Sequence, residues 1–283
     1  MPELPEVETV RIGLTAMVMN RRITGLRIGA FEGVLGDLGF EATHARIVGR
    51  TIVDVSRRAK YLFLVLDDET LISVHLRMTG VLQVVPRSTA PLRFEHLALE
   101  LDDDNDLRFS DQRKFGRVLH IEPSGYDDHD RFLGPEPLDP MFTPEVLSGR
   151  LQGRTAPIKA SLLDQRRVAG LGNIYVDESL FRAGIHPLRP AGSLTASESQ
   201  RLHTAIQTVL SEAIARQGTT FSSFSNPYGE SGNNRPNLRV YGRGRTGEPC
   251  LVCGTGLRLL TVGGRSTHFC AVCQPLDNPT QLP

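Results

Sequence analysis

The chain opens with the stretch Met1-Pro2-Glu3-Leu4-Pro5-Glu6, which combines a candidate nucleophile with the signals of a helix start. Removal of Met1, which a small second residue favours, would leave Pro2 with a free secondary amine. An α-amino group has a pKa of about 7.7–8.0, against about 10.4 for lysine, so much more of it is free base at neutral pH. Such an amine can attack a carbon at the aldehyde oxidation level and form an iminium, with Glu3 placed to transfer a proton.

The same residues also suit a helix that serves only the fold. Pro5 fits the first turn of a helix, and Glu6 and Glu8 suit its positive N-terminal end. A helix from Pro5 to about Met19 is predicted by apolar residues at helical spacing, namely Val7, Val10, Leu14 and Val18. On these residues alone the structural interpretation is favoured, and the nucleophile depends on features elsewhere in the chain.

Short segments of β-type residues follow, separated by turn residues. A short helix is expected among them, between Phe31 and Ile47. The expected strands are Ile23–Ile28, Arg50–Ser56, Tyr61–Leu66, Thr70–Leu76, Gly80–Val85, His96–Leu101, Leu107–Ser110 and Arg117–Ile121. Many short strands with such punctuation predict an antiparallel sandwich or barrel.

The composition changes at the Pro-rich segment 134–140, and the pattern beyond it is helical. Helices are predicted at Thr143–Arg150, Pro157–Leu163, Ile174–Ala183 and Ala196–Gln217. Residues Ser222–Pro236 form a long loop of Ser, Asn, Gly and Pro, and loops of that length in compact domains tend to be functional or disordered.

The bulk numbers restrict the class of protein. A chain of 283 residues can form two domains. No apolar run approaches the roughly 20 residues of a membrane span, and the N-terminus lacks a signal peptide. We therefore expect a cytoplasmic protein without a membrane partner. The formal net charge of zero argues against a strongly basic nucleic-acid-binding protein.

The zero net charge hides a difference between the two halves. Residues 1–149 carry 17 Lys+Arg and 24 Asp+Glu, a net of −7, whereas residues 150–283 carry 15 and 8, a net of +7. A basic second half is compatible with a polyanionic partner. We interpret the acidic clusters of the first half as turns: Asp67–Glu69, Asp102–Asp104, Asp106 and Asp127–Asp128.

Lysine is scarce in this chain. There are 29 arginines but only three lysines: Lys60, Lys114 and Lys159. Arginine stays protonated in proteins, whereas lysine is a compact charge whose pKa can be tuned. Chance retention explains any single lysine equally well, so their positions decide whether they matter.

Four cysteines predict a metal site near the C-terminus. Sixteen residues separate Cys250-x2-Cys253 from Cys270-x2-Cys273, the arrangement of a tetrahedral Zn²⁺ site with four thiolates. Four protein ligands leave no open position, so the Zn²⁺ would be structural. The intervening residues predict a hairpin with Arg265 near its tip. Arg265 is then either a solvated turn residue or a side chain that enters a DNA groove.

Several separate motifs resemble those of bacterial formamidopyrimidine-DNA glycosylases, whose superfamily includes the endonuclease VIII-type enzymes. The motifs are MPELPEVETV (1–10), RRAKYL (57–62), HLRMTG (75–80), DQRKFG (111–116), GLGNIY (170–175), ESLFRAGIHP (178–187), VYGR (240–243) and the cysteine hairpin. So many motifs in the same order favour the nucleophile at Pro2 over the purely structural interpretation.

The resemblance implies an α+β multidomain fold. An N-terminal helix and an antiparallel β-sandwich would form a catalytic domain over residues 1–134, followed by a linker over 135–149. A helix–two-turns–helix domain with a lesion-capping loop would occupy residues 150–237. A zinc β-hairpin with four cysteine ligands would occupy residues 238–274, and a disordered tail residues 275–283.

The resemblance also implies a chemistry: a bifunctional DNA glycosylase and abasic-site lyase for oxidised purines, such as 8-oxoguanine and formamidopyrimidines, in double-stranded DNA. The damaged nucleotide must be flipped out of the duplex, at a cost of about a few kcal/mol. Pro2 would attack C1′, displace the base and form a Schiff base. Glu3 would protonate the sugar ring oxygen, Glu6 would support the site, and β- and δ-elimination would follow.

DNA contacts follow from the same motifs. Phosphate contacts are implied for Lys60, Lys159 and Asn173, the last at a helix N-terminus that suits phosphate. Further contacts are implied for His75, Tyr241 and Arg265, and both Lys60 and Arg265 would also serve the reaction.

Three more residues would fill the gap that the flipped nucleotide leaves in the stack. These are Met78, Arg113 and Phe115, and inserting apolar side chains is a known way to unstack a base step. The alternatives are core packing for Met78 and Phe115 and a surface charge for Arg113.

Some features depart from the family pattern. Gln112 and Lys114 stand where proline and arginine are usual. The capping loop over residues 221–238 reads Asn226-Pro-Tyr-Gly where the family commonly has an Asp-Gly-type turn followed by aromatic residues. An endonuclease VIII-type activity on oxidised pyrimidines is therefore an alternative, although Leu4 is typical of the purine branch. A zinc-dependent DNA-binding protein without catalysis is another, against which Pro2, Glu3 and Glu6 argue. We expect a monomer associated with the nucleoid.

Overall fold

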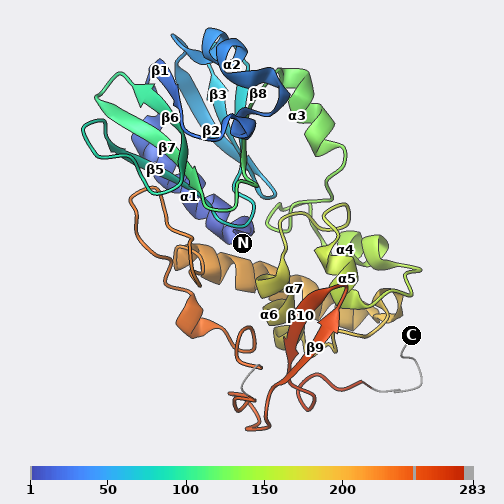
Figure 1. The fold of residues 1–283 in the computed structure, drawn as a ribbon. Helices are drawn as coiled ribbons and strands as arrows, with labels where there is room; N and C mark the ends of the chain where they lie inside the picture. The colour runs from blue at the N-terminus through green and yellow to red at the C-terminus, as the bar shows by residue number, and fades with distance from the viewer. Residues whose placement is uncertain (1, 245–246, 277–283) are drawn as a thin grey trace. The chain divides into compact units, whose positions relative to one another are not determined.

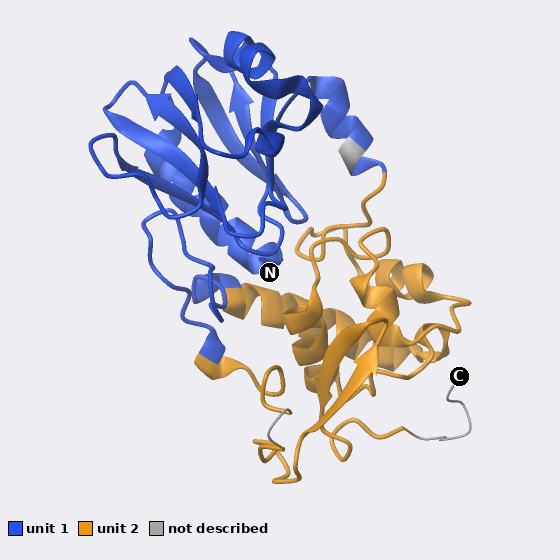
Figure 2. Ribbon diagram, in the orientation of Figure 1, with its two compact units in different colours: residues 1–131, 214–235 blue, residues 132–213, 236–283 orange. Residues whose placement is uncertain are grey.

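The computed structural model describes residues 2–244 and 247–276, and it forms two compact units (Figure 2). Unit 1 contains residues 1–131 and 214–235, and unit 2 contains residues 132–213 and 236–283. Residues 221–235 of the capping loop thus belong to unit 1, and residues 236–238 belong to unit 2. Met1, which we expect to be removed, lies outside the described ranges, and so does the expected disordered tail of residues 275–283 from residue 277 onward.

Unit 1 is a sandwich of two antiparallel four-stranded sheets, which confirms the expected N-terminal fold (Figure 1). One sheet has the order β1 (Ile23–Ile28), β6 (Glu95–Leu101), β7 (Asn105–Asp111) and β5 (Gly80–Pro86). The other has the order β2 (Ile52–Arg58), β3 (Tyr61–Leu66), β4 (Leu71–His75) and β8 (Arg117–Ile121). Each of the eight strands begins and ends within two residues of the expected segment, because short apolar runs between turn residues are a strong strand signal.

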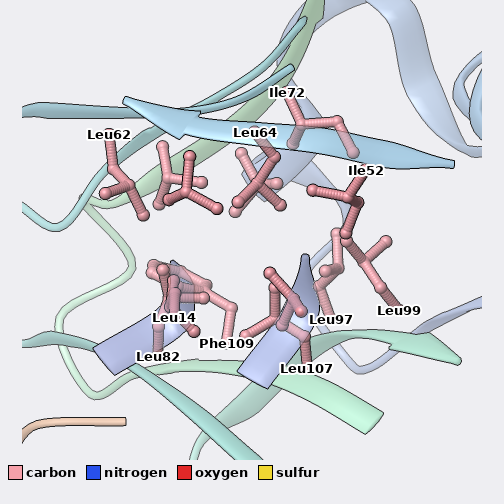
Figure 3. Close-up of a cluster of buried hydrophobic side chains, with 14 of the residues drawn as sticks. Leu14, Ile52, Leu62, Leu64, Ile72, Leu82, Leu97, Leu99, Leu107 and Phe109 are labelled. Carbon is pink, nitrogen blue, oxygen red and sulfur yellow. The ribbon is translucent and has the colours of Figure 1, made fainter. Parts of the chain in front are cut away.

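The core of unit 1 lies between the two sheets. Figure 3 shows Leu62 and Leu64 of β3 facing Leu107 and Phe109 of β7, with Leu14 between the layers. Leu14 belongs to α1 (Leu4–Val18), which buries the apolar stripe expected from its helical spacing. The helix begins one residue before the predicted start because Glu3 serves as its N-cap.

Two expectations for the acidic residues of unit 1 are wrong. Asp127 and Asp128 lie in a helix, α3 (Pro123–Asp130), which starts with proline in its first turn. Its residues are mostly turn formers without an apolar stripe, so the helix gave no periodic signal.

Residues Phe31–Ile47 contain two helical segments rather than one: η1 (Glu32–Leu38) and α2 (Gly39–Ile47).

Asp106 is another acidic residue that does not lie in a turn as expected. It lies within strand β7 and is fully buried. Its carboxylate accepts hydrogen bonds from Arg108 Nη2 at 3.1 Å and Arg87 Nε at 3.2 Å, and it also pairs with Arg27. Arg108 is itself 2 % exposed. The charge that suggested a turn therefore balances a buried guanidinium.

This network predicts a large loss of stability on replacing Asp106 by asparagine. Breaking a buried ion pair leaves the remaining charge without compensation, which typically costs about 3–5 kcal/mol. Urea unfolding should show that loss for Asp106→Asn. Asp104→Asn is the matched control, since the Asp104 side chain is 99 % exposed and should change stability by less than about 0.5 kcal/mol. Equal effects of the two changes would mean that the network contributes nothing.

Unit 2 is helical and ends in a two-stranded hairpin, as expected. Its helices are α4 (Pro144–Leu151), α5 (Ile158–Leu163), α6 (Asn173–Ala183) and most of α7 (Ala196–Ala215), with the 3-10 turn η2 (Ala191–Ser193). The 3-10 turn η3 (Arg235–Asn237) and strands β9 (Arg258–Val262) and β10 (Arg265–Phe269) follow. Among the described residues, no helix has the length and apolar character required to cross a membrane.

The connection between α5 and α6 consists of turns held by one side chain. Gln165 donates through Nε2 to the carbonyl oxygens of Leu163 and Leu171, at 3.0 and 2.8 Å, and its Oε1 accepts the Gly170 N–H at 3.0 Å. These bonds satisfy backbone groups that a loop would otherwise leave to water. They give α6 a fixed start at Asn173.

Candidate active site and nucleic-acid interface

The candidate catalytic residues meet at the start of α1. Pro2, Glu3 and Glu6 are all buried, and Glu3 and Glu6 are only 2 % and 1 % exposed. Glu6 Oε2 accepts the Glu3 N–H at 2.8 Å, and Glu6 Oε1 accepts the Thr219 N–H at 2.8 Å. Glu6 therefore connects the segment that carries Pro2 to the base of the capping loop.

Lys60 lies in the two-residue turn between β2 and β3. Its predecessor Ala59 has φ = 54°, a left-handed conformation that is strained for alanine. The turn is held by Arg57, which donates to Glu8 Oε2 at 2.8 Å and to the Ala59 carbonyl at 2.9 Å. Lys60 itself is 8 % exposed.

Glu8 keeps its negative charge in this arrangement. Burial raises the pKa of the Glu8 carboxyl, but hydrogen bonds and charges from Arg11 and Arg57 outweigh burial and hold the pKa below its ordinary value. The ionised carboxylate anchors Arg57, and Arg57 anchors the turn that carries Lys60. The sequence predicted no role for Glu8 or Arg57 in positioning Lys60, although Arg57 stands in the RRAKYL motif.

The expected gap-filling residues lie in two loops of unit 1. Met78 is half-buried in the loop between β4 and β5, next to exposed Arg77, whose N–H donates to His75 Nδ1 at 3.0 Å. Arg113 and Phe115 lie in the loop between β7 and β8, and the Arg113 guanidinium carbon stands 4.8 Å from the centre of the Phe115 ring. Phe115 is 50 % exposed, so the alternative that it packs in the core is wrong.

Lys159, for which the family motifs imply a phosphate contact, lies in the first turn of α5. Lys159 is fully buried, and its Nζ donates to Asp177 Oδ1 at 2.6 Å and to the Ser266 carbonyl at 2.7 Å. A direct phosphate contact would require the ammonium to leave these acceptors. Asn173 Nδ2 donates to the same carbonyl at 2.9 Å, and Asn173 is the first residue of α6, directly after the N-cap Gly172.

These bonds fix the residue next to Arg265. Arg265 is exposed at the first position of β10, immediately after the turn Gly263-Gly264. Both glycines have positive φ, 55° and 71°, as a two-residue type I′ hairpin turn requires. The hairpin has Arg265 beside its tip, as expected, and Arg265 and Ser266 belong to strand β10.

Two adjacent carboxylates of α6 hold the C-terminal segment of unit 2, and neither was predicted. Asp177 Oδ2 accepts the His268 N–H at 2.9 Å. Glu178 accepts the N–H groups of Arg239, Val240 and Tyr241 at 2.8–2.9 Å, which fixes the backbone at the candidate contact Tyr241. Burial raises the pKa of Glu178, and the three N–H donors offset part of that rise.

A sequence signal for this pair exists. Asp177 and Glu178 are the only acidic residues of α6, a helix whose other positions are almost all buried. Buried carboxylates are rare unless they are paired. Two of them in an apolar helix therefore indicate specific partners, although the sequence does not say which ones.

The four cysteines converge as expected. Their Sγ atoms all lie within 4.8 Å of one another, with 3.8 Å between Cys250 and Cys273 and 3.5 Å between Cys253 and Cys270. Metal–sulfur bonds of about 2.3 Å in a tetrahedron place sulfurs about 3.8 Å apart, so the cluster fits a metal ion. Hydrogen bonds from Thr255 lower the pKa of Cys253 to about 6, whereas burial and the neighbouring thiols raise the pKa of Cys273.

The capping loop has a defined conformation. Buried Asn226 accepts the N–H groups of Tyr228 and Glu230 through Oδ1, at 3.0 and 2.9 Å. The Pro227 carbonyl accepts the Val84 N–H of β5 at 3.1 Å. The tip of the loop is therefore attached to the sheet edge, and the loop is folded rather than disordered.

Three family models match the chain in order. Residues 1–118 match the formamidopyrimidine-DNA glycosylase N-terminal domain, and residues 133–225 match the formamidopyrimidine-DNA glycosylase H2TH domain. Residues 247–276 match a zinc finger found in FPG and IleRS. Together with the sandwich, the helical unit and the four-cysteine hairpin, these matches define a DNA glycosylase of the helix–two-turns–helix class.

Relatives over the full length specify the family. Formamidopyrimidine-DNA glycosylase of Chloroflexus aggregans is 47% identical over 98% of this chain and 99% of its own, and that of Geobacter sulfurreducens is 46% identical over 97% and 100%. A structure of Lactococcus lactis Fpg with abasic-site DNA matches with a TM-score of 0.90 at 35% identity, over 97% of this chain and 100% of that one. The chain belongs to the formamidopyrimidine-DNA glycosylase family.

Proposed function

We propose that this protein excises oxidised purines, 8-oxoguanine and formamidopyrimidines, from duplex DNA and then cuts the strand as an abasic-site lyase. The observation that carries the proposal is the buried group Pro2, Glu3 and Glu6 at the start of α1. A general acid adjoins a potential secondary amine, and Glu6 fixes both through the Glu3 N–H. Two mutants of Lactococcus lactis FPG, 35% and 36% identical to this chain, have been solved with Fapy-dG DNA, which supports the substrate class.

The reaction begins with attack of the Pro2 nitrogen on C1′. A C1′–N bond forms, the bond to the damaged base breaks, and the base leaves with a proton. Glu3 protonates the ring oxygen as the sugar opens, which gives a Schiff base between Pro2 and C1′. The cationic iminium acidifies the C2′ proton. Its removal expels the 3′ phosphate by β-elimination, and a second elimination expels the 5′ phosphate.

The DNA contacts of the proposal come from both units. Lys60 and His75 of unit 1, and Asn173, Tyr241 and Arg265 of unit 2, would hold the backbone around the lesion. Lys60 and Arg265 would also stabilise phosphate charge during the elimination. Lys159 is buried and supports the hairpin through its bond to the Ser266 carbonyl, and its contact with phosphate stays a prediction. Met78, Arg113 and Phe115 would fill the gap left by the flipped nucleotide.

One Zn²⁺ would occupy the four-cysteine cluster. Four thiolates suit zinc, and the backbone N–H groups of Val252 and Cys273 donate to the Cys250 and Cys270 sulfurs at 3.4 Å. With four protein ligands the ion has no open position. Zinc would supply folding free energy to the hairpin and take no part in the reaction.

A second substrate class has one observation in its favour. A structure of wild-type Lactococcus lactis Fpg contains DNA with an oxidised pyrimidine, at a TM-score of 0.89 and 36% identity. An activity on oxidised pyrimidines is therefore the alternative. A monomeric state, a cytoplasmic location and association with the nucleoid stay predictions.

The test is borohydride trapping on a duplex that contains 8-oxoguanine, with mass spectrometry of the cross-linked peptide. The expected result is an adduct on Pro2 after loss of Met1. Replacing Pro2 by glycine should reduce trapping much more than DNA binding, because a primary amine at a shifted position replaces the fixed secondary amine. An adduct only on a thymine-glycol duplex would move the protein to the pyrimidine class. DNA binding with no adduct on either duplex would refute the enzyme activity.

A further inference from the structure

One buried carboxylate connects the two loops that carry the gap-filling residues. Asp111 is the last residue of β7 and is 1 % exposed. Its Oδ2 accepts the Phe115 N–H at 2.8 Å and the Gly116 N–H at 2.7 Å. Its Oδ1 accepts the Arg113 N–H at 3.1 Å and also bonds the hydroxyl of Thr79. Four donors from two separate loops thus converge on one side chain.

The residues around Asp111 restrict its backbone and side chain to one conformation. Its carbonyl oxygen lies 2.8 Å from His96 Nε2, and its backbone pairs with Gly80 in the β5–β7 register. A Cβ on Gly116 would lie 2.4 Å from the Phe109 ring and 3.2 Å from Asp111 Oδ2, so only glycine allows this approach. Strand β7 therefore fixes the carboxylate, and the hydrogen bonds to the carboxylate fix both loops.

The residues held by Asp111 include or adjoin all three side chains expected to enter the DNA stack. Thr79 follows Met78 directly, and Arg113 and Phe115 are bonded through their own N–H groups. The Thr79 hydroxyl also accepts the Arg113 N–H at 3.3 Å, which closes the link between the loops. These bonds give the two loops a shared anchor.

We propose that Asp111 is a positioning residue that holds Met78, Arg113 and Phe115 in one arrangement ready for insertion into DNA. The proposal rests on the proposed function, because it assigns the loops to base flipping. Asp111 touches neither the damaged base nor the reacting atoms. Its effect is on the flipping step, since loops fixed in advance need no ordering when they enter the duplex.

The first test compares two substrates with Asp111→Asn. In the variant, the side-chain NH2 group at position 111 would replace one carboxylate oxygen and cannot accept the N–H bonds made to that oxygen. Either the bonds to Phe115 and Gly116 or the bonds to Arg113 and Thr79 are therefore lost. Excision of 8-oxoguanine should fall about 10–100-fold, the scale expected for a misplacement of about 1 Å. Cleavage at a preformed abasic site should fall less than about threefold, because no base has to be unstacked there. Asp103→Asn, in the turn at the other end of β7, is the control and should leave both rates within about twofold.

The second test is a double-mutant cycle with Phe115→Ala. If Asp111 acts by placing Phe115, removing the ring should slow excision about tenfold in the wild type but less than about threefold in the Asp111→Asn background. Additive effects, or an equal loss of excision and abasic-site cleavage in Asp111→Asn, would overturn the proposal and leave a purely structural carboxylate. Should Asp111→Asn fail to fold, Thr79→Val removes one donor and should show the same pattern at smaller size.

The wild-type protein separates this proposal from the proposed function. A wild type that forms no adduct on either damaged duplex refutes the glycosylase activity itself. A wild type that excises 8-oxoguanine, with Asp111→Asn equally fast, refutes only the role of Asp111.

Discussion

Replacing Glu3 by glutamine is expected to slow excision of 8-oxoguanine by about 10²–10⁴-fold, the usual contribution of a positioned acid or base. Glu3 is 2 % exposed at the N-cap of α1, directly after the proposed nucleophile. Glutamine keeps the shape of the side chain but cannot protonate the sugar ring oxygen. Single-turnover excision assays would measure the loss.

A preformed abasic site serves as the internal control for Glu3→Gln. Part of such a site is already an open-chain aldehyde, so it needs no protonation of the ring oxygen, and strand cleavage there should fall far less than excision. Loss of an N-cap costs about 0.5–2 kcal/mol, so thermal unfolding must show that the variant is folded at the assay temperature. Excision at the wild-type rate would remove Glu3 from the mechanism, and an equal loss on both substrates would assign it to the attack itself.

Removal of the metal should have the second large effect, and it should be confined to one part of the chain. The apolar cluster around the cysteines is small: Phe181, Val240, Cys250, Leu257 and Cys270. Structural zinc sites contribute apparent binding free energies of about 10–16 kcal/mol, which such a cluster cannot replace. Chelation, or replacement of Cys253 by serine, should unfold the hairpin and weaken DNA binding by at least about tenfold, because Arg265 loses its fixed position.

The control for the metal experiment lies between two ligands. Val252 stands between Cys250 and Cys253 and is 71 % exposed, so Val252→Ser should retain one metal ion and the wild-type DNA affinity. Metal content and DNA binding would be measured on the same samples. A metal-free protein that binds DNA as tightly as the wild type would contradict a folding role for the ion.

The elements of the fold could be predicted from the sequence because their signals are local. Strand β3, helix α1 and the cysteine pairs each occupy a few residues whose spacing suffices to identify them. Helix α3 was missed because Pro123–Asp130 contains turn formers and no apolar stripe. The chemistry of Pro2 and Glu3 suggests a catalytic role, but that prediction depends on family motifs spread along the whole chain.

What the sequence could not provide are the partners of buried charges. Asp106 gave the same signal as the acidic turn beside it, and only its pairing with Arg108, Arg87 and Arg27 explains why it is buried. The position of Lys159 depends on Asp177, 18 residues away, and on Ser266, 107 residues away. Such pairings depend on the tertiary structure. A sequence motif does not distinguish a lysine that binds phosphate from one that hydrogen-bonds the backbone of a hairpin.

The division of unit 1 into residues 1–131 and 214–235 has a consequence for biosynthesis. Phe224 belongs to the core of the sandwich, and Thr219 supplies an N–H to Glu6, so unit 1 cannot be completed from its first segment alone. Residues 132–213, 82 in number, must be translated in between. At about 5–20 residues per second, a ribosome needs roughly 4–16 s for them. For that interval the nascent sandwich exposes apolar surface that its last segment later covers, which is when a chaperone would have most to bind.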